Sequence, residues 1–185
     1  PNPARHFFAA RRALITALLC IACPATAQPS ADAIVGLWPD LGRPPAQVGG
    51  GERDAAVLVG ISDYAFLPGI PGAADNARDW YLWLTKGRKV PAARVQLLQN
   101  NDGTNDKILQ AVKRAASGVA PGGTLWLVFI GHGAPARDGK DGVLVGVDAQ
   151  QDATGLYARS LPQRQLIGAA ALGRQARTVL VVDAC

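Results

Sequence analysis

One histidine and one cysteine stand at the ends of two apolar segments of this chain. His132 follows the apolar run 125–130 and lies between two glycines. Cys185 stands three residues after the end of the apolar run 179–182. A thiolate is a strong nucleophile, and an imidazole titrates near neutral pH, so it can take up the thiol proton and later protonate a leaving amine. The two side chains predict nucleophilic catalysis by a Cys–His pair.

The start of the chain predicts an export signal, and outside this segment His132 and Cys185 are the only histidine and the only cysteine in the sequence. Residues 1–27 contain three arginines, an apolar run too short to span a bilayer, and a small-x-small cleavage pattern. Cys20, Cys23 and His6 all lie in this segment. We expect a periplasmic or secreted protein. A lipoprotein is the less favoured alternative, because the residues before Cys23 match a lipoprotein signal poorly.

Charge and composition exclude several classes of partner. Without residues 1–27, sixteen basic and fourteen acidic side chains remain, so the formal charge of +5 falls to about +2. This balance argues against nucleic acid, and we expect no stable membrane span. Residues 28–54 are rich in proline, glycine and alanine, which predicts a flexible lead-in before one domain at 55–185.

Alternating segments predict an α/β domain with a mainly parallel sheet flanked by helices. Strands are expected at 55–61, 94–98, 125–130 and 178–185. Helices are expected at 73–87, 104–118 and 160–173. The segment 143–147 predicts a hairpin strand outside the main sheet, and 150–159 predicts a loop.

Parallel strands would bring His132 and Cys185 to the same edge of the sheet. The backbone N–H groups of Gly133 and Cys185 would then be candidate donors to an oxyanion. Each side chain alone also fits a structural role, because a glycine-flanked histidine suits a turn and a cysteine suits a buried apolar site. Their pairing at two strand ends favours catalysis.

These motifs resemble the caspase-like clan of cysteine peptidases (peptidase C14), and metacaspases and bacterial caspase-domain proteins more closely. The main similarity lies at Gly131–Gly133 and Asp183–Cys185. Weaker matches lie at Val59–Tyr64, Pro71–Ala73 and Arg159–Pro162. The resemblance implies a three-layer caspase-haemoglobinase fold with a sheet of six strands. It also implies a polypeptide substrate, hydrolysed by a dyad of His132 and Cys185.

The resemblance further implies cleavage after Arg or Lys. Caspases carry glutamine two residues before the cysteine, whereas this chain carries Asp183. In metacaspases the matching acid lines the pocket for a basic side chain, where opposite charges attract. A second acid is expected after the first strand, and Asp75 is the nearest candidate, although it is one place out of register. Helix-dipole stabilisation also explains Asp75, and a backbone hydrogen bond also explains Asp183.

In the family, further strands follow the cysteine, so the resemblance implies that this chain is the N-terminal part of a peptidase domain. The fragment alone can be inactive even if its parent protein is a peptidase. One alternative is a non-catalytic caspase-like binding or signalling module. An unrelated flavodoxin-like or thioesterase-like domain is disfavoured, because the chain has no phosphate loop and no Gly-x-Ser-x-Gly elbow.

No cofactor or metal is predicted. Calcium requires six or more oxygen ligands at defined spacing. The acids of the later loops lack that spacing and are explained by turns: Asp138, Asp141, Asp148 and Asp152.

Overall fold

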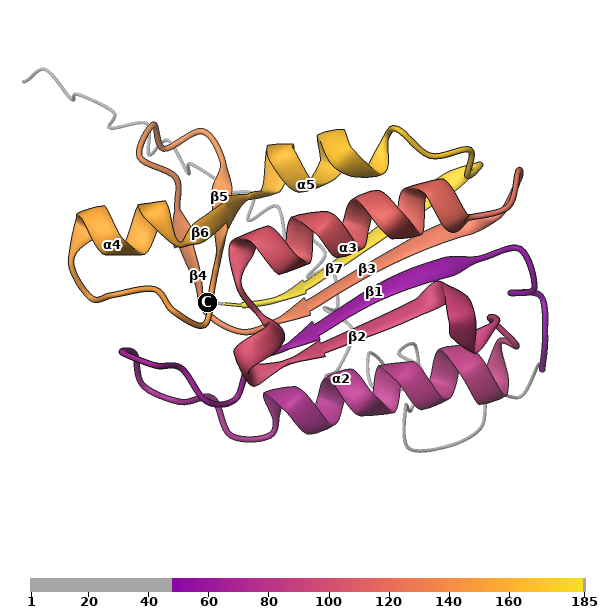
Figure 1. The fold of residues 1–185 in the computed structure, drawn as a ribbon, viewed down its shortest axis with the longest axis horizontal. Coiled ribbons are helices and arrows are strands. Elements are labelled where there is room, and N and C mark those ends of the chain that lie inside the picture. Colours follow the sequence, from indigo (N-terminus) through magenta and orange to yellow (C-terminus); the bar gives the residue numbers. More distant parts are fainter. Residues whose placement is uncertain (1–47, 185) are drawn as a thin grey trace, which may run out of the picture. The chain divides into compact units, whose positions relative to one another are not determined.

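Four parallel strands form the central sheet, in the order β2-β1-β3-β7 (Figure 1). The structure is a computed structural model and describes residues 48–184. The predicted signal at 1–27 and the predicted nucleophile Cys185 lie outside the described residues. The strands are β1 (Ala55–Gly60), β2 (Val95–Gln99), β3 (Thr124–Ile130) and β7 (Arg177–Asp183). The predicted α/β class with a parallel sheet is confirmed.

Helices connect the strands and cover both faces of the sheet. The longer helices are α2 (Ala73–Leu82), which continues as the π-helical turn η1 (Trp83–Gly87), α3 (Asn105–Gly118) and α5 (Gln163–Ala170). Short 3-10 turns precede and follow β2 at η2 (Ala92–Arg94) and η3 (Asn100–Asp102). Helices α3 and α5 lie over one face of the sheet and α2 over the other (Figure 1). The three predicted connecting helices are thus present.

The alternation of side chains along β1 divides the core into two layers. Val57 and Val59 pack in the cluster that contains α3 and α5. Ala56 and Leu58 pack in the cluster that contains α2. Successive residues of a strand point to opposite faces, so a strand covered on both sides must be apolar throughout. This explains why the central strands are continuous apolar runs.

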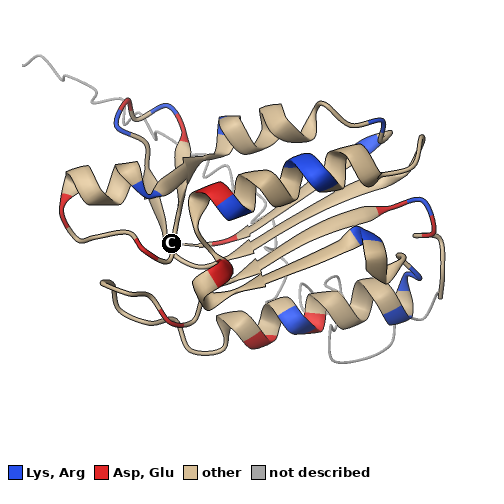
Figure 2. Cartoon of the chain, viewed as in Figure 1, with Lys and Arg blue, Asp and Glu red and all other residues tan. Residues whose placement is uncertain are grey.

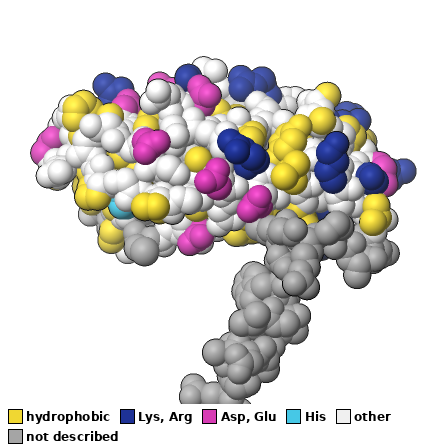
Figure 3. Space-filling model, turned by 90° about the horizontal axis from the view of Figure 1, so that it is seen from below, with side chains coloured by type: hydrophobic (Ala, Val, Ile, Leu, Met, Phe, Trp, Pro, Cys, Tyr) yellow, Lys and Arg dark blue, Asp and Glu magenta, His cyan; other side chains and the backbone are white. Residues whose placement is uncertain are grey.

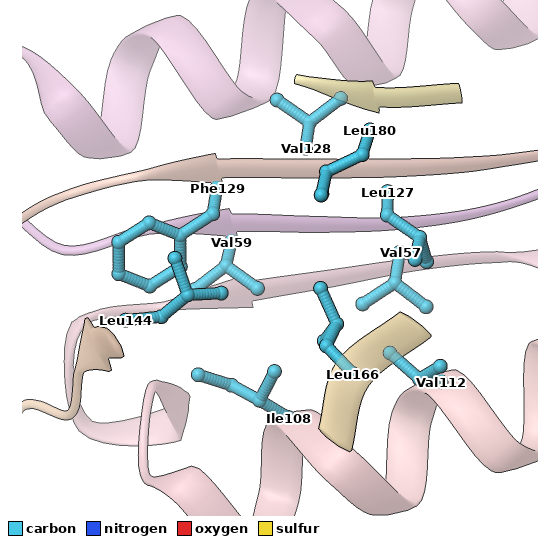
Figure 4. A pocket seen from close by; sticks show the side chains of 10 residues that line it. All are labelled: Val57, Val59, Ile108, Val112, Leu127, Val128, Phe129, Leu144, Leu166 and Leu180. Atoms are coloured by element: carbon cyan, nitrogen blue, oxygen red, sulfur yellow. The ribbon is translucent and has the colours of Figure 1, made fainter. Parts of the chain in front are cut away.

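The α3 and α5 layer is filled almost completely. Side chains from the sheet, from both helices and from β5 converge on one small apolar space of about 10 Å³ (Figure 4). A space of this volume could hold at most one water molecule, and because its lining is apolar it stays dry. The space is a packing defect of the core, so the functional site must be sought elsewhere.

A small antiparallel sheet lies outside the main sheet. Its strands are β4 (Gly133–Pro135), β5 (Gly142–Val145) and β6 (Ser160–Pro162), in the order β4-β5-β6. The predicted hairpin strand near 143–147 is confirmed as β5. Strand β4 begins directly after His132, so the small sheet borders the carboxyl end of β3.

Two sequence predictions near β6 are wrong. The segment 150–159 was expected to be a loop, but it contains the short helix α4 (Ala153–Ala158), because the Asp152 side chain accepts a hydrogen bond from Gly155 N at 2.9 Å and caps it. The next helix begins at Gln163, not at Ser160. Pairing of Leu161 with Leu144 buries both side chains and holds 160–162 as a strand.

Residues 48–54 are hydrogen-bonded to the turn that follows α2 and η1. Gly49 N and Gly51 N donate to carbonyl oxygens of Gly87 and Arg88, both at 2.8 Å. Asp54 is 2% exposed and ends this segment. The described end of the segment 28–54 is therefore fixed against the turn that follows α2.

The surface of the α2 side carries basic and acidic side chains among hydrophobic ones (Figure 3). Among residues 48–184, none of the helices combines the length and the apolar character needed to cross a bilayer.

Candidate active site

Strands β3 and β7 are neighbours, and their register aligns the strand end that precedes His132 with the described end of β7. Ile130 pairs with Asp183 in the parallel ladder. Beyond this pair, Gly131 N donates to the Asp183 carbonyl oxygen at 3.1 Å. His132 follows Ile130 by two residues, as Cys185 follows Asp183 by two residues in the sequence. The described part of the site therefore contains the histidine and the strand end that leads to the cysteine.

The His132 ring is held by a backbone carbonyl. Its Nε2 lies 2.9 Å from the Pro68 carbonyl oxygen. A carbonyl oxygen only accepts, so this hydrogen bond requires the proton on Nε2. Nδ1 has no hydrogen-bond partner among residues 48–184. In the neutral imidazole, Nδ1 then carries the lone pair and can serve as a base.

Tyr64 contacts both the backbone and the ring of the histidine. Its hydroxyl oxygen accepts a hydrogen bond from His132 N at 2.7 Å. The two ring centroids are 4.7 Å apart, with the planes tilted by 52°. Burial raises the pKa of Tyr64 to about 12, against a smaller lowering by the hydrogen bond from His132 N. The hydroxyl therefore stays protonated over the ordinary pH range.

Asn100 organises the loop that carries Tyr64 and Pro68. Its side-chain oxygen accepts hydrogen bonds from Ser62 N at 2.8 Å and Asp63 N at 3.2 Å. Asn100 has φ of 45°, a left-handed conformation that asparagine tolerates better than most residues. Sequence reasoning did not assign Asn100, Pro68 or Tyr64 to the site. Only Tyr64 had a signal, as part of the motif at 59–64.

Gly133 retains a backbone donor at the site. Val145 N donates to the His132 carbonyl oxygen at 2.9 Å, so His132 and Val145 share a hydrogen-bonded rung between β4 and β5. Antiparallel rungs alternate, so the next pair, Gly133 with Leu144, is a non-hydrogen-bonded pair. The Gly133 N–H is therefore not hydrogen-bonded to β5 and can donate to a ligand.

The two acids predicted to bind substrate lie on the same face of the sheet. Asp183 is two residues after Val181 in β7, so the two side chains point to the same face of the sheet. Val181 packs against the core on the α2 side, so Asp183 also lies on that side. Asp75 lies in the first turn of α2. It is exposed, and its Oδ1 is 3.7 Å from Arg78 Nη1. No hydrogen bond or ion pair joins Asp75 to Asp183 or to His132 within the described part of the chain.

A groove of about 300 Å³ opens on the other side of the strand end. It is lined mainly by apolar groups and backbone of β4, β5 and the end of β7, including Ala134, Val143, Val182 and Ala184. Gly133 also lines it, so the groove adjoins the residue that follows His132.

The acids of the later loops are used within the fold. Arg164 Nη1 donates to Asp138 at 3.0 Å, and Arg164 N donates to Asp141 at 3.1 Å. The hydrogen bond from Lys140 N lowers the pKa of Asp138, with help from Arg164. Asp148 pairs with Arg159 at 2.8 Å. Between residues 48 and 184, no group of three His, Cys, Asp or Glu side chains is placed to hold a metal ion.

Comparisons with known proteins identify a similar fold. No protein-family model matches the chain, and no curated protein matches it. The chain is similar to the crystal structure of protein GSU0716 from Geobacter sulfurreducens, with a TM-score of 0.55 and 18% sequence identity. The match covers 75% of this chain and 50% of that protein, so the chain spans about half of its length. At this identity, the similarity supports the α/β fold alone.

Proposed function

We propose that this chain carries the catalytic pair of a caspase-like cysteine endopeptidase, with His132 as the base and Cys185 as the nucleophile. The observation that carries the proposal is the register of β3 and β7. Each proposed catalytic residue lies two positions beyond the pair Ile130–Asp183. Neighbouring strands lie about 4.8 Å apart, so two side chains at matched positions beyond one pair can come within reach of each other.

The proposed reaction uses Nδ1 of His132, which has no hydrogen-bond partner between residues 48 and 184. Nδ1 takes the proton of the Cys185 thiol, and the thiolate attacks the carbonyl carbon of the peptide bond. The backbone N–H groups of Gly133 and Cys185 stabilise the oxyanion. The protonated imidazole then gives its proton to the leaving amine. Water, deprotonated by His132, hydrolyses the thioester and regenerates the thiol.

The distribution of charge supports a basic residue before the cleaved bond. Acidic residues lie at or just beyond the carboxyl ends of three strands: Asp63, Asp102 and Asp183 (Figure 2). Basic residues lie at or just before the amino ends of three strands: Arg53, Arg94 and Arg177. The positions just beyond the carboxyl ends contain acids and no lysine or arginine, whereas Asp54 at the opposite end is buried and hydrogen-bonded within the fold. We propose that Asp183, with Asp75 on the same face, selects Arg or Lys.

The test is hydrolysis of fluorogenic peptides ending in Arg, Lys or Asp by the full-length protein. We expect turnover of the Arg and Lys peptides, and its loss in Cys185→Ala and in His132→Ala. Asp183→Asn should lower kcat/KM for the Arg peptide roughly a hundredfold. Asp102→Asn is the matched control, because Asp102 is paired with Lys107 at 2.7 Å, and it should leave kcat/KM unchanged.

Two outcomes would contradict the proposal. Turnover unaffected by Cys185→Ala and His132→Ala would exclude the dyad. Preference for the Asp peptide would overturn the assignment of a basic specificity while leaving the dyad in place.

A further inference from the structure

A tyrosine hydroxyl is inserted into the rung of the small sheet beside His132. A hydrogen-bonded antiparallel pair normally exchanges two direct bonds. Here Val145 N donates directly to the His132 carbonyl oxygen at 2.9 Å. The reciprocal bond is relayed, because His132 N donates to Tyr64 Oη at 2.7 Å and Tyr64 Oη donates to the Val145 carbonyl oxygen at 3.3 Å. Tyr64 therefore links the backbone of the histidine to β5.

The Tyr64 hydroxyl lies so close to the Gly131 backbone that no side chain would fit at residue 131. A Cβ atom at Gly131 would lie 2.5 Å from Tyr64 Oη and 3.0 Å from the Phe129 ring. The hydroxyl can thus reach the rung only because residue 131 has no side chain. The position of Tyr64 is set by packing as well as by its two hydrogen bonds.

The loop between β1 and α2 fixes three features of His132. Tyr64 binds its N–H and packs against its ring, and the Pro68 carbonyl oxygen accepts from its Nε2. The loop is itself tied down, since Ala65 N donates to the Val147 carbonyl oxygen at 2.9 Å. Backbone, ring plane and proton position are therefore held by one segment.

We propose that Tyr64 is a positioning residue for His132, whose bridging hydroxyl keeps Nε2 on the Pro68 carbonyl and leaves Nδ1 as the basic nitrogen. The kinetic consequence rests on the proposed peptidase function. The effect of Tyr64 on the tautomer of the His132 ring does not depend on that function and can be measured in the absence of catalysis. Because the bridge both accepts and donates, it requires a protonated hydroxyl, and phenylalanine would keep the ring packing but lose the bridge.

The experiment compares Tyr64→Phe with a matched control, Tyr157→Phe. The Tyr157 hydroxyl also donates to a backbone carbonyl of this region, Pro135 O at 3.1 Å, and it does not contact His132. The first readout is the ¹⁵N chemical shifts of the His132 ring in the Cys185→Ala background, assigned with His132→Ala. We expect the Nε2–H tautomer to dominate in the parent and in Tyr157→Phe, and the Nδ1–H fraction to rise in Tyr64→Phe.

The second readout is kinetic and uses the full-length protein with Cys185 intact. In Tyr64→Phe we expect kcat to fall roughly tenfold with KM within about twofold, because a misplaced base slows chemistry more than binding. Tyr157→Phe should leave both values unchanged. Thermal unfolding checks that Tyr64→Phe, which fills nearly the same volume, remains folded.

The outcomes separate this inference from the proposed function. Tautomer populations in Tyr64→Phe equal to those in Tyr157→Phe would overturn the positioning role, as would an unchanged kcat in an enzyme that depends on His132. If turnover does not depend on His132 or Cys185, the peptidase proposal fails, and the tautomer measurement still decides the role of Tyr64.

Discussion

The backbone segment that carries His132 is closely packed against the side chains of Tyr64 and Phe129. Gly131 precedes His132 and faces the Tyr64 hydroxyl and the Phe129 ring. The glycine is required by this close approach and not by an unusual backbone angle, since its φ is not positive. At the residue scale, the site is therefore sensitive to a single methyl group.

Gly131→Ala should lower the free energy of unfolding by about 1–3 kcal/mol, because the added Cβ must displace Tyr64 or Phe129. Gly118→Ala is the matched control. Gly118 ends α3, and a Cβ there meets nothing within 4 Å, so its stability should be unchanged or slightly higher. Urea unfolding of both variants checks this, and equal stabilities would contradict the close packing at Gly131.

The amino ends of β1 and β3 are joined by one buried carboxylate. Asp54 precedes β1, and its Oδ1 accepts from Thr124 N at 2.7 Å. Its Oδ2 accepts from Trp126 Nε1 at 2.9 Å. Arg88 Nη2 lies 3.9 Å away, so the charge is compensated. At the scale of elements, this carboxylate fixes the strand pair at the end opposite His132.

Asp54→Ala should cost about 3 kcal/mol in the free energy of unfolding, because it leaves one buried and one half-buried donor without their acceptor. Asp79→Ala serves as the control, since Asp79 is an exposed residue of α2. Chemical denaturation followed by tryptophan fluorescence measures both. A loss in Asp54→Ala no larger than that in Asp79→Ala would show that the carboxylate does not join the strands.

The long elements were predictable from the sequence because their apolar patterns follow the period of a helix or of a doubly covered strand. The expected start of α3 near residue 104 also agrees with the structure, where Thr104 is the N-cap and its side chain accepts from Lys107 N. The short elements α4 and β6 were missed, because β6 depends on its pairing with β5 and on burial of Leu161, which no local pattern shows.

The site was predictable only in part, for a similar reason. His132 stood out by its residue type and its flanking glycines. Its partners Tyr64 and Pro68 lie more than sixty residues earlier, and Pro68 contributes only a backbone oxygen. A contact made by backbone atoms has no signature in residue type. Asn100 acts by holding the backbone of a distant loop, and the hydrophobic periodicity of a sequence gives no indication of such a contact.

The stability of the whole molecule should depend on Tyr64 at alkaline pH. The pKa of Tyr64 is raised from its model-compound value of 10.0 to about 12 in the folded protein, chiefly by burial. The contribution of Tyr64 to the free energy of unfolding is fully present below pH 10 and is lost between pH 10 and about 12. The reason is that the Tyr64 hydroxyl loses its proton at lower pH in the unfolded chain than in the folded protein.

The urea midpoint should therefore fall more steeply between pH 10 and 12 in the parent than in Tyr64→Phe. Tyr157→Phe should follow the parent, since it retains Tyr64. Unfolding curves at half-unit pH steps provide the measurement, and identical slopes in all three proteins would rule out the Tyr64 contribution.

The register of β3 and β7 has a consequence for how this molecule tolerates insertions. The offset between the carboxyl ends of β3 and β7 is set by the pair Ile130–Asp183 and not by the long connection between the two strands. Extra residues in the exposed turn at 138–140 would leave that offset intact. One residue added between Ile130 and His132 would reverse the side of the sheet to which the imidazole is directed. Surrounding loops can thus vary in length around two strand ends that the sheet keeps in register.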